Sequence, residues 1–345
     1  MHTNRFGVFD HIERRGDSVD GLFAGRFELI KEYDAAGFFC YHVAEHHATP
    51  LGMAPSPGLF LAAAAQCTRR IHLGPLVYLL PLYNPLRLVS EICMVDHISE
   101  GRFEIGVGRG VSPFELAYYG VSFMDAHEIF EEALDVVATG LRNDRLAHRG
   151  KHYRFDSVPV ELRPRQQPNP PFWYGVSSPA SLMFAARRGM NMVSGGPISV
   201  LKSLTAAFRE EAARHKGKAE DLNPHIAEPT VGAIRHCYVS GDDREIETIA
   251  RPAYATYYNN ITKLWRDFRT VPDYGFTPDL ALARKNDVAI VGSAEAVRDE
   301  VGRFFEQSGC NYLVLSCAWG GLSQDDSRRS LDRFVTKVMP QFVKP

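Results

Sequence analysis

The sequence has little excess charge of either sign. Its 345 residues include 39 basic and 41 acidic side chains, which gives a formal net charge of −2. A strongly basic chain would attract nucleic acid or an anionic membrane surface, and this chain carries no such field. We therefore expect neither nucleic acid nor a membrane among its partners.

Long apolar runs are also missing, and we expect no leader segment. The longest apolar candidate, residues 73–82, is interrupted by Pro75 and Pro81, whereas a membrane-spanning helix needs roughly 18 apolar residues in a row. The first nine residues, MHTNRFGVF, lack the apolar core of a secretory signal. The six cysteines form no CxxC pair and are typical of isolated thiols in a reducing compartment. These absences predict a cytoplasmic protein.

The chain does contain a repeated pattern in which a short apolar strand leads through a turn into an amphipathic helix. Apolar residues make up 45% of the sequence, enough for a large core. The pattern predicts strands over residues 6–9, 41–44, 71–80, 103–107, 172–176, 191–194, 230–239 and 312–315. It predicts helices over residues 22–36, 58–67, 85–98, 126–141, 180–188, 203–215, 243–261, 294–307 and 327–339. Such alternation is typical of a parallel sheet covered by helices.

About eight such units, without a linker rich in Gly and Ser, favour a single α/β domain over residues 1–345, a (β/α)8 TIM barrel. Two stretches break the pattern and are expected as insertions that shape the pocket. One lies near residues 142–171, with a hairpin around 152–155, and the other near 265–285. An open doubly wound sheet is the alternative, but it needs a topological switch point and usually has fewer strands.

The most distinctive polar cluster is Glu45-His46-His47, which directly follows the second predicted strand. In a barrel this is the carboxyl end of a strand, where active sites lie. A histidine there can move a proton near neutral pH, and an adjacent carboxylate can orient it. A polar pair that only satisfies a loop is an equally good interpretation of the spacing. Metal binding is disfavoured, because the helical HExxH spacing is absent.

Two further segments carry features of an anion site. Gly108 and Arg109 belong to a glycine-rich GVGRG stretch after the fourth predicted strand, where backbone can approach a ligand and a guanidinium can pair with an anion. As a dinucleotide fingerprint the stretch is weak, because no helix is expected to begin there. Ser177, Ser178 and Ser181 surround the start of the next helix. Helix capping accounts for one or two of these serines, and a bound phosphate accounts for all three.

These stretches coincide in one family. FGVFD at residues 6–10, AEHH at 44–47 and LLPLYNPLRLVSEICMVDHISEGRFEIGVGRG at 79–110 combine with the serine turn and AARRG at 185–189. On these motifs the sequence resembles the bacterial luciferase-like flavin monooxygenases, whose chains are (β/α)8 barrels. The resemblance covers nearly the whole chain and is strongest in the first 130 residues.

The resemblance implies a two-component monooxygenase that uses reduced FMN and O2. A separate NAD(P)H-flavin reductase would supply the flavin, and a C4a-peroxyflavin would oxygenate a small organic substrate. His46 falls on the family's catalytic histidine, with Glu45 orienting it. Arg109, Ser177, Ser178 and Ser181 would hold the phosphate. The flavin ring would lie over Leu76 and Val77, which a cis peptide would join, and beside Gly108. No metal is implied, and a homodimer is expected through helices near 58–67 and 85–98.

Two departures from the family pattern argue against light emission. Gly108 replaces the reactive cysteine of the luminescent alpha chain, and Ser177 replaces a carboxylate found in some members. Two alternatives stay open: an F420-dependent oxidoreductase that transfers hydride, and a non-catalytic flavin-binding protein or partner subunit. The motifs select neither the organic substrate nor hydroxylation over Baeyer–Villiger chemistry.

Overall fold

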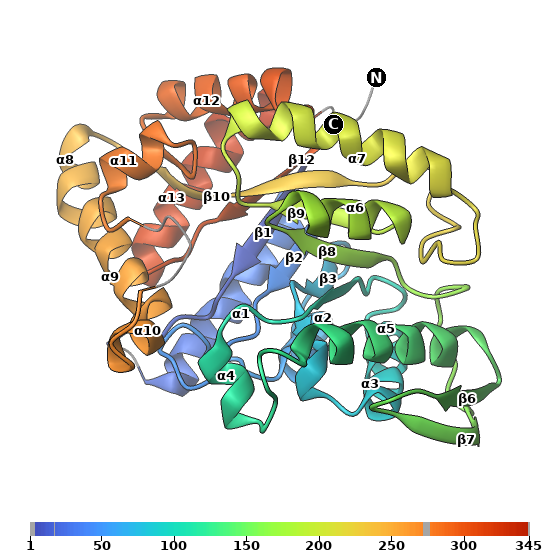
Figure 1. Cartoon of the computed structure of the whole chain (residues 1–345). Coiled ribbons are helices and arrows are strands. Elements are labelled where there is room, and N and C mark those ends of the chain that lie inside the picture. The colour runs from blue at the N-terminus through green and yellow to red at the C-terminus, as the bar shows by residue number, and fades with distance from the viewer. Residues whose placement is uncertain (1–3, 17, 272–276, 344–345) are drawn as a thin grey trace.

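The computed structural model describes residues 4–16, 18–271 and 277–343, and within them a parallel barrel lies inside a ring of helices (Figure 1). Its main sheet has ten strands. Two of them, β3 (His72–Pro75) and β4 (Tyr78–Leu79), are successive pieces of one strand position, and β11 (Ala289–Gly292) pairs only with β10 (Val231–Val239). The other strands are β1 (Arg5–Asp10), β2 (Cys40–Val43), β5 (Ile105–Gly108), β8 (Phe172–Val176), β9 (Asn191–Ser194) and β12 (Tyr312–Ser316).

The broken third strand closes the barrel. β3 pairs in parallel with β2, and β4 pairs in parallel with β5, so the two ends of the sheet meet within one chain segment. Within the sheet β1 lies between β12 and β2, and its Val8 is paired with Leu315 of β12 and with Tyr41 of β2. The strand positions number eight around the barrel, with β11 as an additional strand beside β10. The predicted barrel is therefore confirmed.

The helices begin and end largely where capping signals place them. Ser18 caps α1 (Val19–Ala36), which ends at Gly37 in the left-handed conformation. The Asn84 side chain accepts hydrogen bonds from two backbone N–H groups at the start of α3. The other long helices are α2 (Pro57–Gln66), α3 (Pro85–Ile98), α5 (Ala126–Arg142), α6 (Pro179–Arg187), α7 (Ile198–His215), α9 (Arg251–Ile261), α12 (Ala294–Gln307) and α13 (Gln324–Lys337). None of the described helices is long and apolar enough to span a bilayer.

Several short elements were not predicted. They are α4 (Pro113–Tyr118), α10 (Lys263–Asp267), α11 (Leu280–Lys285) and β11, each between four and six residues long. Segments this short show no hydrophobic period that separates them from a loop. The helix predicted to begin at Ser203 starts at Ile198 instead, after Pro197. The predicted helix over 243–261 is present as α8 (Asp243–Glu245), a π-helical turn η2 (Ile246–Ala250) and α9.

The first insertion forms the predicted hairpin but does not shape the pocket. Strands β6 (Arg145–Arg149) and β7 (Arg154–Pro159) pair antiparallel, and they lie beside α3 and α5 at the lower right of Figure 1. Because the hairpin connects α5 to the start of β8, it lies at the amino ends of the strands, opposite an active site. Of the second insertion, 265–285, residues 272–276 are outside the described residues, and in its described part Trp265 and Phe268 pack against Phe114 of α4.

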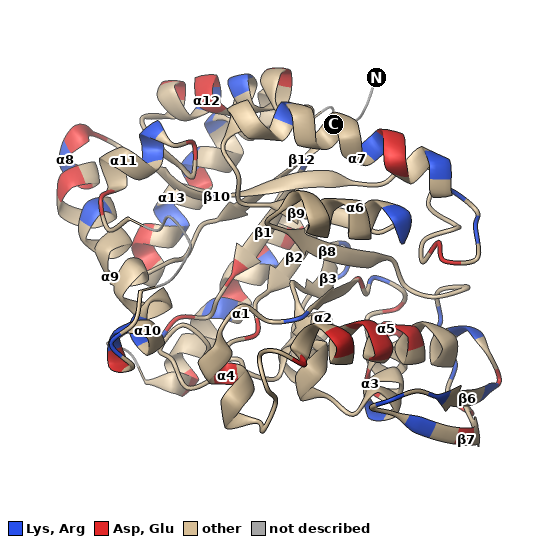
Figure 2. Cartoon of the chain, in the orientation of Figure 1, with Lys and Arg blue, Asp and Glu red and all other residues tan. Residues whose placement is uncertain are grey.

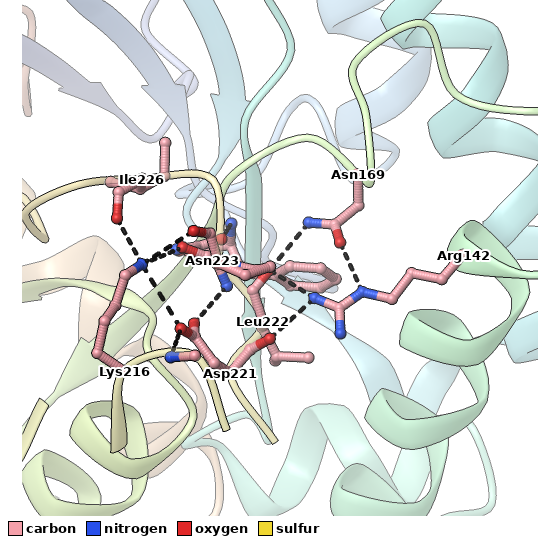
Figure 3. Close-up of polar contacts among 10 residues, drawn as sticks. Arg142, Asn169, Lys216, Asp221, Leu222, Asn223 and Ile226 are labelled. Carbon is pink, nitrogen blue, oxygen red and sulfur yellow. Dashed lines mark hydrogen bonds and ion pairs between the residues drawn. The ribbon is translucent and has the colours of Figure 1, made fainter. Parts of the chain in front are cut away.

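A polar network fastens the amino end of β8 to the loop after α7 (Figure 3). The Asn223 side chain accepts a hydrogen bond from the Phe172 N–H at 2.8 Å and donates one to the Phe172 carbonyl at 3.0 Å. Lys216 Nζ donates to the carbonyls of Asn223 and Ile226, while Arg142 donates to the carbonyl of Leu222. These hydrogen bonds hold the loop after α7 against the amino end of β8 and the end of α5.

The core fills the barrel and the layer between strands and helices. Charged side chains gather on the outer helices, and the central strands carry few of them (Figure 2). Inside the barrel Leu76, Trp173, Val193, Tyr312 and Val314 form one buried apolar cluster. The six cysteines, all within the described part of the chain, are unpaired thiols.

Candidate active site

A cavity of about 930 Å³ opens at the carboxyl ends of the strands. Its lining comes from the ends of β2, β4, β5 and β8, the start of α6 and the break between β3 and β4. Every site residue expected from the sequence lines this one cavity: Glu45, His46, Leu76, Val77, Gly108, Arg109, Ser177, Ser178 and Ser181. Segments up to 136 positions apart are brought together because each follows a strand of the same barrel. The residue roles themselves stay predictions.

His46 has a different partner from the one expected. Its Nδ1 atom lies 3.1 Å from Oε1 of Glu115, on α4, and the same carboxylate oxygen accepts the backbone N–H of His47. The expectation that Glu45 orients His46 is wrong, because the Glu45 carboxylate bonds elsewhere. Oε1 of Glu45 lies 2.9 Å from Nε2 of His47, and Oε2 accepts the Leu79 N–H.

Burial and charge act in opposite directions on the pKa of His46. Burial lowers this pKa, but the charge and hydrogen bond of Glu115 raise it more, so the pKa lies above its usual value of 6.5. Burial raises the pKa of Glu115, but the charge and hydrogen bond of His46, together with the backbone N–H and charge of His47, outweigh it, and the pKa falls. His46 and Glu115 therefore stabilise each other's charged forms.

The pKa of Glu45 is raised, because burial outweighs the effect of its hydrogen bonds. Burial raises the pKa of its carboxyl, and the hydrogen bonds from His47, from the Leu79 N–H and from the Tyr83 hydroxyl offset only part of that increase. Glu45 therefore takes up a proton more readily than an exposed glutamate. The loop after β2 thus presents an imidazole and a carboxyl group that both hold a proton more tightly than their exposed counterparts.

Further titratable groups are buried behind His46. The His11 and His46 ring centres lie 5.5 Å apart, and those of His236 and Tyr257 lie 4.3 Å apart. Burial lowers the pKa of His11 well below its usual value and that of His236 to about 4, so both stay neutral at pH 7. Burial raises the pKa of Glu13 to about 7. Among the described residues, Nδ1 of His11 and Nε2 of His236 have no hydrogen-bond partner.

The opposite end of the cavity is basic and rich in hydroxyl groups. The Arg109 guanidinium lies 4.8 Å from the centre of the Phe123 ring and extends along the cavity wall. Arg187 and Arg188, at the basic end of α6 in Figure 2, also line the cavity and are paired with Glu211 and Asp135. This arrangement suits a phosphate.

The serine turn is both a helix cap and part of the cavity wall. The Ser178 side chain accepts the Ser181 N–H, and the Ser181 hydroxyl oxygen accepts the N–H groups of Ser177 and Ser178 at 3.1 and 2.9 Å. Helix capping therefore accounts for these contacts. Ser177 and Ser178 are exposed and Ser181 is half-buried, and all three line the cavity, so the turn brings hydroxyl groups to the start of α6, where an anion can bind.

Between the end at His46 and the end at Arg109, the cavity wall is apolar and includes Leu76, Val77 and Gly108. The peptide bond between Leu76 and Val77 is cis, as predicted. A Cβ atom added at Gly108 would lie 2.5 Å from Cγ2 of Val77, so a side chain there has no room. This wall has room for a flat ring, and the basic, hydroxyl-rich end of the same cavity has room for a phosphate. The residues present therefore fit FMN.

Sequence reasoning missed three residues that contact the cluster, namely Tyr83, Glu115 and Tyr119. A sequence pattern could have located Glu115. Ser112 and Glu115 stand three residues apart, with Pro113 at the first helical position, which is the pattern of a capping box at the start of a helix. The Ser112 side chain does accept the Glu115 N–H. The two tyrosines had no comparable signal, because only the folded chain brings them to Glu45 and His47.

Comparison with known proteins decides the family. The model of the luciferase-like monooxygenases matches residues 4–312. The chain belongs to this family. The protein y4wF of Sinorhizobium fredii is 38% identical over 93% of this chain and 92% of its own. The oxygenase component of the flavin-dependent trigonelline monooxygenase of Acinetobacter baylyi is 29% identical over 98% of this chain and 95% of its own.

Solved structures share the fold. The oxygenating constituent of 3,6-diketocamphane monooxygenase of Pseudomonas putida, solved with FMN, matches with a TM-score of 0.80 at 22% identity, over 99% of both chains. An F420-dependent secondary alcohol dehydrogenase matches with a TM-score of 0.74 at 19% identity, over 99% of this chain and 100% of its own. The same barrel therefore serves both cofactors.

Proposed function

We propose that this luciferase-like monooxygenase is the oxygenase component of a two-component system. It would bind reduced FMN from a separate NAD(P)H-flavin reductase and use O2 to oxygenate a small organic substrate. One observation carries the proposal: a single cavity joins a basic, hydroxyl-rich end at Arg109 to the His46–Glu115 pair. The relative from Acinetobacter baylyi, itself named an oxygenase component, supports it.

Each part of the cavity has a definite task in this reaction. Arg109 and the serine turn would hold the phosphate, while the Leu76–Val77 peptide and Gly108 would form the wall against the ring. Reduced flavin, when bound, supplies the two electrons that activate O2. His46 is held through Nδ1 by Glu115, which leaves Nε2 to give or take a proton in the cavity. The buried barrel floor, which includes Trp173 and Tyr312, excludes water from below.

The proposed role of His46 is tested by His46→Ala. We expect reduced FMN to bind nearly as before, because His46 is not part of the phosphate end, while oxygenation falls roughly tenfold or more. Binding is followed anaerobically by absorbance, and oxygenation by product formation in a panel of aldehydes and ketones. Equal oxygenation by both proteins would show that His46 has no part in the chemistry.

F420-dependent hydride transfer is the second candidate, because an F420-dependent alcohol dehydrogenase shares the fold. Incubating the protein with reduced FMN or reduced F420, with and without O2, separates the two candidates by absorbance. A monooxygenase oxidises reduced FMN rapidly only when O2 is present. A hydride-transfer enzyme oxidises reduced F420 in the absence of O2 once a reducible substrate is added, and that result would overturn the proposal.

We also propose a cytoplasmic homodimer formed through α2 and α3. These helices pack together and carry large apolar side chains on the surface: Leu59 is 74% exposed, Met94 54% and Ile98 37%. Exposed apolar residues on adjacent helices are typical of a subunit contact. A reducing compartment suits the six unpaired thiols. Light scattering of Leu59→Glu, expected to yield monomers, tests the dimer.

A further inference from the structure

Two cavities lie on opposite sides of the loop after β2. The active-site cavity includes Glu45 and His46 in its lining. A second cavity of about 630 Å³ is lined by His47 and Tyr119, together with Tyr118 and Lys263. The side chains of Glu45 and His47 therefore form the wall between the two spaces.

A continuous chain of hydrogen bonds crosses this wall. Oε1 of Glu45 lies 2.9 Å from Nε2 of His47, and Nδ1 of His47 lies 2.8 Å from the Tyr119 hydroxyl. The Glu45 side chain is 1% exposed, the His47 side chain 11%, and Tyr119 as a whole 52%. Exposure thus rises step by step from the active-site cavity to the surface. Both ring nitrogens of His47 are used, which is the arrangement that lets an imidazole pass a proton from one side to the other.

Surrounding contacts hold the chain in place. The Glu115 carboxylate accepts the His47 backbone N–H, and the Leu79 N–H and Tyr83 hydroxyl fix the second oxygen of Glu45. The rings of His47 and Tyr119 meet edge to face, with centres 4.7 Å apart. The folded structure therefore fixes the hydrogen-bond chain from Tyr119 through His47 to Glu45. The role proposed for His46 does not use this hydrogen-bond chain.

We propose that Tyr119, His47 and Glu45 form a proton relay that connects solvent to the active-site cavity. A solvent acid gives its proton to the Tyr119 oxygen as the Tyr119 O–H proton passes to Nδ1 of His47. The Nε2–H proton of His47 passes in turn to Oε1 of Glu45. Three bonds to hydrogen break and three form, and no electrons are transferred. The His47 side chain is 11% exposed, and proton exchange with solvent, which removes the Nδ1 proton and adds one at Nε2, returns the ring to its starting tautomer. Glu45, whose pKa burial raises, then holds the proton at the cavity.

The proton relay itself does not depend on the proposed function. Only the reaction that would use the proton, the oxidation of reduced FMN by O2, rests on that function. Without an organic substrate, anionic reduced FMN, O2 and one proton yield oxidised FMN and hydrogen peroxide. The flavin loses two electrons, and the O2 gains them together with two protons. The active-site floor is closed by apolar side chains, so the relay gives this proton a path that does not require water in the cavity.

The first experiment measures proton conduction without any flavin. In the ligand-free protein, NMR follows the exchange of the His47 Nε2–H proton with solvent. We expect Tyr119→Phe to slow this exchange roughly tenfold or more, because the outer donor is removed while the ring stays. Added imidazole, which the outer cavity can admit, should restore the rate. Tyr118→Phe is the matched control, since the neighbouring tyrosine is equally exposed at 52% and takes no part in the chain.

The second experiment measures the use of the proton. Stopped-flow absorbance follows the oxidation of enzyme-bound reduced FMN by O2. We expect a slower rate in Tyr119→Phe that rises with imidazole concentration, and a rate independent of imidazole in the wild type and in Tyr118→Phe. Exchange at the wild-type rate in Tyr119→Phe would overturn the relay. Slowed exchange with unchanged flavin oxidation would overturn its part in the reaction. Failure to bind reduced FMN would instead contradict the proposed function, while the exchange experiment still decides the relay.

Discussion

Nδ1 of His46 lies 3.1 Å from Oε1 of Glu115, a hydrogen bond that joins the loop after β2 to the first turn of α4. Burial lowers the pKa of this histidine, whose side chain is 19% exposed, and the charge and hydrogen bond of Glu115 are the largest of the contributions that bring it above its usual value. The charge state of the proposed catalytic histidine is therefore set by a residue on a different βα unit.

The variant Glu115→Gln tests this dependence. The amide keeps the shape of the side chain and removes its charge, so the pKa of His46 should fall and less of the imidazole should be protonated at pH 7. NMR titration of the His46 ring in the ligand-free protein measures the change. Glu131→Gln is the control, because Glu131 is an exposed carboxylate on α5 whose ion pair is with His127. A His46 pKa that stayed unchanged in Glu115→Gln would contradict the assignment.

Arg109→Ala should weaken the binding of FMN and leave that of riboflavin almost unchanged, because riboflavin lacks the phosphate. A hydrogen bond to a charged group contributes about 1.5–3 kcal/mol, so the dissociation constant for FMN should rise roughly tenfold to a hundredfold. Isothermal titration with both ligands measures this difference. Arg187→Ala, whose guanidinium is already paired with Glu211, should have a smaller effect. Equal losses for FMN and riboflavin would place the phosphate elsewhere.

Much of the fold follows from local sequence. The strands 172–176 and 191–194 and the helix 294–307 were predicted with the bounds that the structure shows, because each is a strongly patterned segment between clear turn or capping residues. The nine predicted site residues meet in one cavity for a topological reason, since parallel strands deliver their carboxyl ends to the same face.

What the sequence could not supply are contacts between side chains from different units. Glu45 was assigned to His46 because the two are adjacent in the chain, yet successive residues at a strand end point in different directions. Glu45 instead contacts His47, two positions on, and Glu115 reaches His46 from α4. The 142–171 insertion was expected at the pocket, although it follows a predicted helix and precedes a predicted strand, an order that assigns it to the amino ends of the strands.

Gly108→Ala tests how closely the cavity wall is packed. The new Cβ would lie 2.5 Å from Cγ2 of Val77, a β-branched side chain with few alternative rotamers. We expect a loss of about 1–3 kcal/mol in the free energy of unfolding and weaker binding of both FMN and riboflavin, as Val77 is displaced into the cavity. Chemical denaturation and ligand titration measure the two effects.

Gly175→Ala is the matched control for Gly108→Ala. Gly175 lines the same cavity from β8, but a Cβ there meets nothing within 4 Å. Its stability should change by less than about 1 kcal/mol, since alanine also reduces the entropy of the unfolded chain. Equal destabilisation by the two substitutions would show that contact with Val77 is not what excludes a side chain at Gly108.

The buried histidines should make the protein sensitive to mild acid. Burial lowers the pKa of His42 from 6.5 to about 3 and that of His236 to about 4. Their stabilising contribution is complete above pH 6.5 and is lost as the pH falls, because only the unfolded chain then takes up the protons. At pH 5 each costs roughly 2 kcal/mol of the free energy of unfolding. Urea denaturation between pH 7 and pH 5 should show this loss.

Protonation of Glu13 changes the stability of the fold with pH in the opposite direction from protonation of the buried histidines, so a Glu13 variant tests the pH dependence most directly. Burial raises its pKa from 4.5 to about 7, so the folded chain binds this proton more tightly and gains roughly 2 kcal/mol between pH 7 and pH 5. Glu13→Gln cannot titrate and keeps an oxygen to accept the Asn260 side-chain hydrogen bond. The variant should therefore lose stability more steeply with acid than the wild type. Parallel pH profiles for the two proteins would mean that Glu13 is ionised in the folded barrel at pH 5.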